Sequence, residues 1–161
     1  MGSFEAVILL FTTLTLNAQP PAKTIPEFRF SRHDHSVFGN TDLPKDHLLL
    51  FVFFDPDCEH CQRTVRAMDK DRLSFQRVFV CLVSMAGQDK IDRFAASYAP
   101  RLRGLANVAF LRDAGGGYML RFHPIRFPSL YLYSSDKTLL DYEDNEETLF
   151  RIERSIAAHA K

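Results

Sequence analysis

The pattern of apolar and polar positions divides most of the chain into alternating strands and helices. Two largely apolar runs, at 48–54 and 78–85, are typical of strands that are buried on both faces of a sheet. Each run is followed by a segment with apolar side chains at helical spacing, at 62–72 and 88–98. The inward positions that this spacing predicts are Val65, Met68 and Leu73 in the first helix and Ile91, Phe94, Ala95 and Tyr98 in the second.

Weaker signals continue the alternation on both sides of these four elements. The remaining predicted elements are strands at 28–30, 107–111, 127–133 and 138–142 and helices at 118–122 and about 146–158. The polar stretch 31–46 is expected to be a loop, which leaves 28–30 as a short edge strand. Because strands separated by helices pair in parallel, the order βαβαβαββα predicts an α/β fold. Its central mixed sheet is expected to end in an antiparallel hairpin at the edge.

The N-terminal residues do not fit this alternation. Residues 6–16 form an uncharged run that is too short to span a bilayer, which requires about 20 apolar residues, but that matches the core of a signal peptide. Glu5 and the lack of Lys or Arg before the run depart from the usual signal pattern. We expect residues 1–18 to be a signal peptide; the alternative is a buried N-terminal strand or helix.

The residues after this segment complete the expected domain organisation. Residues 19–26 contain three prolines and are expected to form an extended leader, which leaves 27–161 as one domain. We therefore expect a periplasmic or otherwise exported protein that is not an integral membrane protein.

Composition and charge narrow the function only slightly. The 161 residues suit a single domain, and 46% hydrophobic residues exclude disorder, a coiled coil and collagen. Lys plus Arg and Asp plus Glu both number 20, so charge gives no reason to expect nucleic acid as a partner. Three cysteines are too few for a disulfide scaffold, and an odd number leaves at least one unpaired or paired between molecules.

Two of the cysteines, Cys58 and Cys61, lie where the strand at 48–54 gives way to a helix. The free N–H groups and partial positive charge of a helix start stabilise an anion, and thiol pKa values fall to about 3.5–7.5 at such positions. Three residues later, Cys61 is close enough to form a reversible disulfide with Cys58. The spacing predicts a redox pair with an exposed attacking thiol and a more buried resolving thiol.

Four charged or titratable neighbours are expected to modulate this pair. His60, when protonated, would favour the Cys58 thiolate and make the disulfide more oxidising. Asp55, Asp57 and Glu59 would act in the opposite direction by charge repulsion.

The sequence from Phe53 to Cys61, with Phe127-Pro128-Ser129 about seventy residues later, resembles the thioredoxin superfamily. The strand and helix inserted between them, at about 78–100, are similar to those of its exported TlpA/ResA-type branch. The resemblance covers about residues 25–160 and implies a thioredoxin-like fold: a central mixed sheet flanked by helices, with an inserted β-α unit.

The resemblance also assigns roles to individual residues. It implies that Cys58 is the nucleophile and Cys61 the resolving cysteine. It further implies that Pro128 is a cis-proline and that the backbone of Phe127 pairs with bound substrate.

The chain departs from the superfamily pattern at three places. Asp57 replaces the Trp that often precedes the first cysteine, and Glu59-His60 replaces the common Gly-Pro or Pro-Pro pair. A histidine at this position resembles oxidising members and disulfide isomerases. Val52 replaces the buried acid of thioredoxin, and Asp55, the carboxylate nearest to that position in the sequence, is the candidate proton acceptor for Cys61.

These observations predict an exported thiol–disulfide oxidoreductase. It would act on protein disulfide or dithiol substrates and be recharged by an unidentified redox partner. We expect a monomer that requires no organic cofactor. The alternative is a thioredoxin-like metal chaperone or binding module that uses the same cysteines, in which Cys58, Cys61, His60 and His33 would bind a soft metal such as copper(I). A peroxidase-type enzyme is a third hypothesis.

The remaining cysteine and histidines carry weaker signals. Cys81 lies inside an apolar strand and is expected to be an inert core residue. His123 is close to Pro128 in the sequence, but we expect it to be capped or solvated. His33 and His35 are expected to be solvated loop residues.

Overall fold

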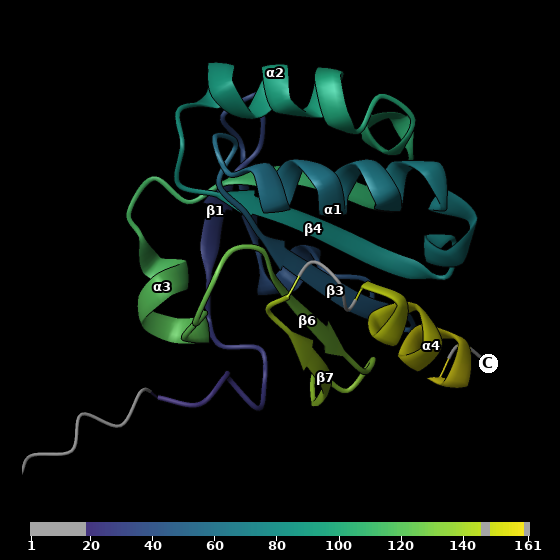
Figure 1. Ribbon diagram of the computed structural model, residues 1–161. Helices are drawn as coiled ribbons and strands as arrows, with labels where there is room; N and C mark the ends of the chain where they lie inside the picture. Colours follow the sequence, from purple (N-terminus) through teal and green to yellow (C-terminus); the bar gives the residue numbers. More distant parts are fainter. Residues whose placement is uncertain (1–18, 146–148, 160–161) are drawn as a thin grey trace, which may run out of the picture.

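The computed structural model describes residues 19–145 and 149–159 (Figure 1). The expected signal peptide at 1–18 lies outside the described residues. The strands are β1 (Arg29–Ser31), β2 (Val37–Gly39), β3 (Leu48–Phe53), β4 (Val78–Ser84), β5 (Val108–Arg112), β6 (Ser129–Tyr133) and β7 (Leu139–Glu143). The α-helices are α1 (Glu59–Lys70), α2 (Gln88–Tyr98), α3 (Gly117–Phe122) and α4 (Leu149–His159), and short 3-10 helices occupy Asn40–Asp42, Arg72–Phe75 and Leu102–Gly104. No helix in this described part is both long and apolar enough to cross a membrane.

The seven strands form one mixed sheet in the order β2-β1-β5-β4-β3-β6-β7. The three inner strands β5, β4 and β3 are parallel, and β6 and β7 follow as an antiparallel pair beside β3. The carboxyl ends of β3, β4 and β5 therefore lie side by side at the same end of the strands, which is also where β6 begins. In the register, Phe53 at the end of β3 lies opposite Val83 of β4 and Ser129 of β6.

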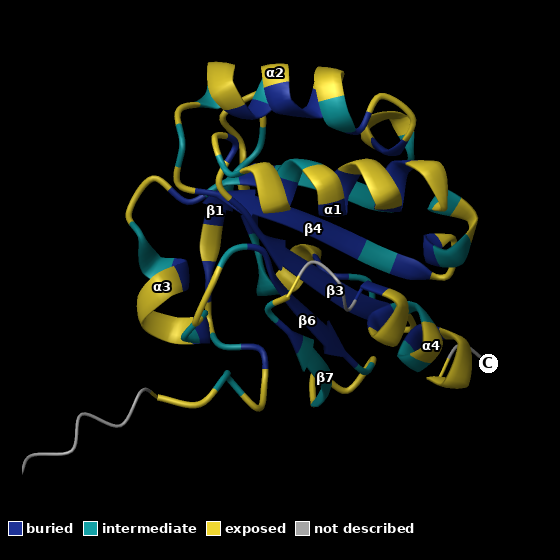
Figure 2. Ribbon diagram, viewed as in Figure 1, coloured by how far each residue is buried: buried dark blue, intermediate teal, exposed yellow. Residues whose placement is uncertain are grey.

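Alternate residues of the central strands divide the core into two layers, one on each face of the sheet. Leu50 and Val52 point to the face that α1, α2 and α4 cover, whereas Phe51 and Phe53 point to the face that α3 covers. The second layer is dominated by stacked and edge-to-face aromatic rings, among them Phe53 and Tyr118, whose ring centroids are 4.2 Å apart. Figure 2 shows the inner strands as the buried centre of the molecule and the outer faces of α1 and α2 as exposed.

The predicted central elements are confirmed, but the structure corrects three expectations at their margins. The stretch 31–46 is not a loop throughout: Val37–Gly39 forms β2 at the edge of the sheet, and β1 lies inside it between β2 and β5. A turn closed by the Asp34 carboxylate, which accepts from the Ser36 backbone and hydroxyl, brings β2 back onto β1. Phe38 is then buried in the aromatic layer, which is what stabilises so short a strand.

The second correction concerns Leu73, which was predicted to point inward and is 62% exposed. α1 ends at Lys70, and the chain turns at Asp71 into a 3-10 helix, so the helical spacing that buries Val65 and Met68 does not extend to Leu73. Phe75 is the buried residue of this turn instead.

The third correction concerns the direction of β6. A helix separates it from β5, yet β6 runs antiparallel to its neighbour β3. α3 has only six residues, about 9 Å of helix, which is too short to carry the chain back along a five-residue strand of about 17 Å. The chain therefore enters β6 from the edge at which β5 ends.

Residues 22–25, within the expected leader, dock on the domain. Ala22 donates to the carbonyl oxygen of Phe122 at 3.1 Å, and Ile25 donates to that of Lys137 at 3.1 Å. An isolated bridge joins Thr24 to Thr138, and the side chain of Ile25 is buried. These contacts attach residues 22–25 to the end of α3 and to the β6–β7 hairpin.

Candidate active site

Cys58 lies in the connection between β3 and α1, as the sequence predicts. The strand ends at Phe53, and a tight turn follows in which the backbone N–H of Cys58 donates to the carbonyl oxygen of Asp55 at 3.1 Å. The Asp55 carboxylate accepts from the Asp57 backbone N–H at 2.9 Å and so helps to close the turn. Cys58 itself is the N-cap of α1, with extended backbone angles (φ −85°, ψ 119°).

The two thiols of the motif are adjacent, and their environments differ. The backbone N–H of Cys61 donates to Cys58 Sγ at 3.5 Å. Cys58 is partly exposed, whereas Cys61 is completely buried beneath the first turn of α1, and both are free thiols. Burial raises the pKa of the Cys61 thiol far above its ordinary value, and the neighbouring Cys58 sulfur raises it further. Cys61 is therefore held as a neutral thiol beside a sulfur that accepts its own backbone N–H.

Two of the three acidic residues near Cys58 are paired with cations. Lys90 Nζ, from the first turn of α2, lies 2.6 Å from Asp57 Oδ2. Arg63 lies 3.6 Å from the Glu59 carboxylate, one helical turn away on α1. The repulsion that these carboxylates were expected to exert on the Cys58 thiolate is consequently opposed by two positive charges.

His60 points to the same arginine. A guanidinium nitrogen of Arg63 lies 2.9 Å from His60 Nδ1. Because a guanidinium group can only donate, Nδ1 is the acceptor in this contact. The contact occupies one of the two ring nitrogens.

Phe127 and Pro128 lie at the same edge of the sheet as the cysteines. The Phe127–Pro128 peptide bond is cis. Since Phe53 is opposite Ser129, Pro128 lies next to the end of β3 from which the Cys58 turn departs. The Phe127 ring packs on Phe53, with the ring centroids 5.0 Å apart.

A cleft of about 380 Å³ opens between this loop and the start of α2. Phe127 and the 85–87 loop give it an apolar wall, and Asp55, Asp57 and Lys90 line it beside the cysteine turn. Met85 in that loop is partly exposed. The cleft is therefore apolar on one side and charged next to the motif.

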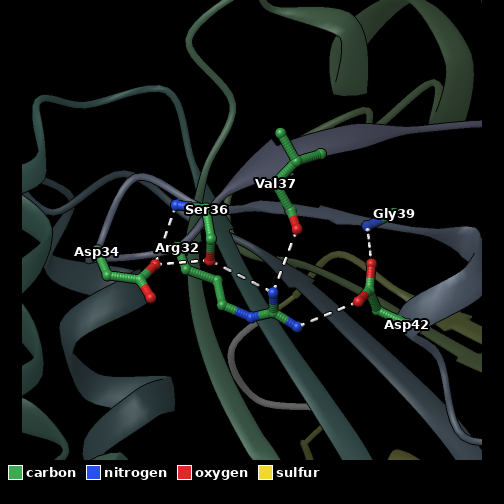
Figure 3. A network of polar contacts seen from close by, with 6 residues as sticks. All are labelled: Arg32, Asp34, Ser36, Val37, Gly39 and Asp42. Carbon is green, nitrogen blue, oxygen red and sulfur yellow. Dashed lines mark hydrogen bonds and ion pairs between the residues drawn. The ribbon is translucent and has the colours of Figure 1, made fainter.

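A larger cavity, of about 630 Å³, lies elsewhere and shares no lining residue with this cleft. It is lined in part by Arg32 and His33 from the β1–β2 turn. The Arg32 guanidinium is held by Ser36, the Val37 carbonyl oxygen and Asp42, as Figure 3 shows. Arg32 and Asp42 at this cavity thus stabilise the hairpin.

His33 and His123 are engaged away from the cysteines. His33 Nδ1 lies 2.9 Å from Asp92 on α2, and His123, at the end of α3, lies 3.1 Å from the Pro20 carbonyl oxygen. Across residues 19–145 and 149–159, no group of three or more His, Cys, Asp or Glu side chains is arranged to hold a metal ion. The structure therefore does not assemble the predicted metal set of Cys58, Cys61, His60 and His33.

Cys81 is a core residue, as predicted. It is completely buried among the aromatic side chains on the α3 face of the sheet. Burial raises the pKa of its thiol, which keeps the group neutral.

Sequence reasoning missed Lys90 and Arg63. The spacing of Glu59 and Arg63, four residues apart on a predicted helix, was a usable signal for their ion pair. Nothing in the sequence indicates that Lys90, 33 residues after Asp57, lies against it.

Comparison with known proteins identifies the fold. No protein-family model and no curated protein sequence matches the chain. Among solved structures, the peroxidoxin BcpB from Mycobacterium tuberculosis is similar, with a TM-score of 0.71, 14% identity and coverage of 86% of this chain and 96% of that one.

Two further solved structures illustrate the range of similar proteins. A secreted M. tuberculosis disulfide oxidoreductase homologous to E. coli DsbE has a TM-score of 0.65, 17% identity and coverage of 81% and 95%. BsSco, from the Sco family of cytochrome c oxidase assembly proteins, has a TM-score of 0.66, 18% identity and coverage of 88% and 96%. The chain thus has a thioredoxin-like fold, with a Cys-x-x-Cys pair at the start of its first α-helix.

Proposed function

We propose that the protein is a thiol–disulfide oxidoreductase that exchanges electrons with protein substrates through Cys58 and Cys61. The observation that carries this proposal is the asymmetry of the pair. Cys58 is partly exposed at the helix start and accepts the Cys61 N–H, whereas Cys61 is completely buried and neutral. An exposed attacking sulfur with a protected second sulfur is what two-step disulfide exchange requires.

In the reducing direction, the Cys58 thiolate attacks one sulfur of a substrate disulfide and forms a mixed disulfide. The other substrate sulfur leaves as a thiolate and takes up a proton. Cys61 then loses its proton, attacks Cys58 Sγ and releases the second substrate sulfur as a thiol. Two electrons pass to the substrate together with two protons, one released by Cys61 and one taken from solvent, and the Cys58–Cys61 disulfide is formed. The oxidising direction is the exact reverse of these steps.

The raised pKa of Cys61 has a defined place in this sequence. A neutral Cys61 does not attack before the substrate is bound. It must lose its proton at the mixed-disulfide stage, when Cys58 no longer carries negative charge and the substrate covers the site. Asp55 lies near enough to affect the Cys61 thiol electrostatically and remains our candidate for the proton acceptor.

We propose that the cleft beside Phe127 receives the substrate polypeptide. Its apolar wall and the backbone around Phe127 and Pro128 would hold an extended segment next to Cys58. His60, Glu59, Asp55 and Asp57 would modulate the pair. A redox partner of the same disulfide chemistry would recharge it.

We further propose that the protein is exported and belongs to the TlpA/ResA-type branch, with residues 1–18 as signal peptide, 19–26 as leader and 27–161 as a monomeric domain. The sequence pattern of 6–16 and the inserted strand and helix, β4 and α2, support this. Expression of the full chain in a bacterial host, followed by N-terminal sequencing of the periplasmic fraction, tests it. An N-terminus at Gln19 supports export, and retention of Met1 in the cytoplasm contradicts it.

The activity is tested by reduction of insulin with dithiothreitol as electron source. Cys58→Ser should abolish turnover, and Cys61→Ser should also abolish turnover but accumulate a mixed disulfide with insulin. Cys81→Ala, the matched control, should retain activity because Cys81 contacts neither the cleft nor the pair. Full activity in Cys58→Ser would contradict the proposal.

Two other activities are separated by the same preparations. Peroxide consumption that exceeds insulin reduction would favour the peroxidase hypothesis. Stoichiometric, tight copper binding by the reduced protein with negligible exchange would favour the metal chaperone. Either outcome would replace the oxidoreductase proposal.

A further inference from the structure

We infer that Lys90, on α2, is a positioning residue that sets the redox equilibrium of the Cys58–Cys61 pair by neutralising Asp57. This inference rests on the proposed function, because it concerns the same pair. It is independent of which substrate or partner the pair serves.

The geometry places Lys90 across the cleft from the cysteine turn. Lys90 Nζ lies 2.6 Å from Asp57 Oδ2, and both residues line the cleft. Asp57 directly precedes Cys58, and its backbone is fixed by the bond from its N–H to the Asp55 carboxylate. The fold thus brings Lys90, from a distant part of the sequence, into contact with the carboxylate of the residue that precedes Cys58.

The electrostatic consequence has a definite sign. A carboxylate beside a thiolate raises the free energy of the thiolate, and an ammonium group on that carboxylate offsets the repulsion. The thiolate exists only in the reduced protein, so whatever stabilises it stabilises the reduced state and makes the disulfide more oxidising. Lys90 should therefore shift the pair toward the oxidant side.

The other charged groups near the motif are arranged differently. Glu59 and His60 both contact Arg63, which belongs to α1 itself. Asp55 is engaged in the turn through its contact with the Asp57 N–H. Of these charge pairings, only the one between Asp57 and Lys90 joins the cysteine turn to another element, so it can be altered without changing α1.

The size of the effect is limited by solvent. The side chains of Asp57 and Lys90 are 70% and 51% exposed, and exposed ion pairs contribute little to stability. We expect each single substitution to change the equilibrium constant about two- to fivefold, an effect that added salt reduces.

The experiment is a glutathione redox titration of the full chain with four variants. Lys90→Met should raise the equilibrium constant for disulfide formation about two- to fivefold, and Asp57→Asn should lower it by a similar factor. The double variant should lie near the wild type, and Lys90→Arg should restore most of the Lys90→Met shift. The thiolate fraction of Cys58, from its ultraviolet absorbance, should fall in Lys90→Met and rise in Asp57→Asn.

The opposite signs separate tuning from a structural role. If Lys90 and Asp57 merely hold the turn against α2, both single variants should shift the equilibrium in the same direction or not at all. Either result would overturn the inference. Lys70→Met, which removes the same charge from the last turn of α1, is the matched control and should leave the equilibrium unchanged.

The inference and the proposed function fail in distinguishable ways. If the wild-type protein reduces insulin but Lys90→Met does not change the redox equilibrium, the proposed function stands and the inference about Lys90 fails. If the wild-type protein does not reduce insulin but the variants shift the cysteine equilibrium with the predicted signs, the proposed function fails and the inference about Lys90 stands.

Discussion

The backbone N–H of Cys61 points at the sulfur of Cys58, with the nitrogen 3.5 Å from Sγ. This contact makes Cys58 the N-cap of α1, so its sulfur occupies the place where a helix stabilises negative charge. The same turn of helix buries Cys61 completely. One structural feature therefore gives the two thiols different roles, and the first prediction follows from that difference.

The three cysteines should differ in their rate of alkylation. In the reduced native protein at neutral pH, iodoacetamide should modify Cys58 first, because Cys58 is partly exposed at the start of α1. Cys61 and Cys81 are buried and neutral, so each should react at least about tenfold more slowly than Cys58. Mass spectrometry of peptides from a time course measures the order. Modification of Cys61 before Cys58 would contradict the assigned roles.

The reduced protein should lose stability at alkaline pH. The pKa values of Cys61 and Cys81 are raised in the folded state, so the unfolded chain releases these protons at about pH 8.5 while the native protein retains them. The stabilisation is complete below about pH 8.5 and is lost as pH rises above it. Between pH 7 and pH 9.5, each of the two thiols should lower the free energy of unfolding by about 1.4 kcal/mol.

Urea denaturation at the two pH values measures this loss. Cys81→Ala should reduce it by about half, because one of the two buried thiols is removed. A loss of the same size in Cys81→Ala as in the wild type would show that Cys81 does not contribute.

Asp69 should be important for stability although it is remote from the cleft. Its carboxylate lies on α1 and accepts the backbone N–H groups of Arg101 and Leu102, each at 2.8 Å. Asp69→Ala leaves two backbone donors unpaired beside the core and should cost about 2–4 kcal/mol of unfolding free energy. The exposed Asp46→Ala serves as control and should change the free energy by less than about 0.5 kcal/mol. Equal, small effects of both variants would show that these two hydrogen bonds of Asp69 do not stabilise the fold.

Phe127 should affect substrate binding but not the redox equilibrium. Its ring forms part of the apolar wall of the cleft and packs on Phe53. Phe127→Ala should raise KM for a protein disulfide about tenfold, since a buried aromatic contact contributes about 1.5–3 kcal/mol. The glutathione equilibrium constant should not change.

Phe150→Ala, which removes an exposed ring from α4, is the control for this variant. An unchanged KM in Phe127→Ala, or a change of the same size in Phe150→Ala, would contradict a role of Phe127 in substrate binding.

The sequence was most informative where the hydrophobic pattern is continuous. Leu48–Phe53 and Val78–Ser84 are buried on both faces, so their apolar runs identify the inner strands, and the position of Cys58 follows from the strand boundary. β2 was missed because only Phe38 of its three residues is buried, and the ring that stacks on Phe38 at 6.0 Å belongs to Phe79 in a distant part of the sequence. Local pattern also does not contain the direction of β6, which depends on the length of α3.

The same limit applies at the candidate site. The Cys-x-x-Cys spacing and the neighbouring carboxylates are visible in the sequence, but the cations that oppose those carboxylates are less so. Arg63 is four residues from Glu59 and within reach of local reasoning, whereas Lys90 depends on how α2 packs against α1. The charge balance at Cys58 is thus a property of the tertiary structure.

The central claim is most directly tested by a redox titration of the wild-type protein in glutathione buffers, with the Cys58–Cys61 disulfide quantified by mass spectrometry. We predict one two-electron transition between fully reduced and fully disulfide-bonded Cys58–Cys61, at a potential within the range from about −270 to about −120 mV that disulfide oxidoreductases occupy. A Cys58 that accumulates only as the glutathione adduct, with no Cys58–Cys61 disulfide at any potential in this range, would contradict the account.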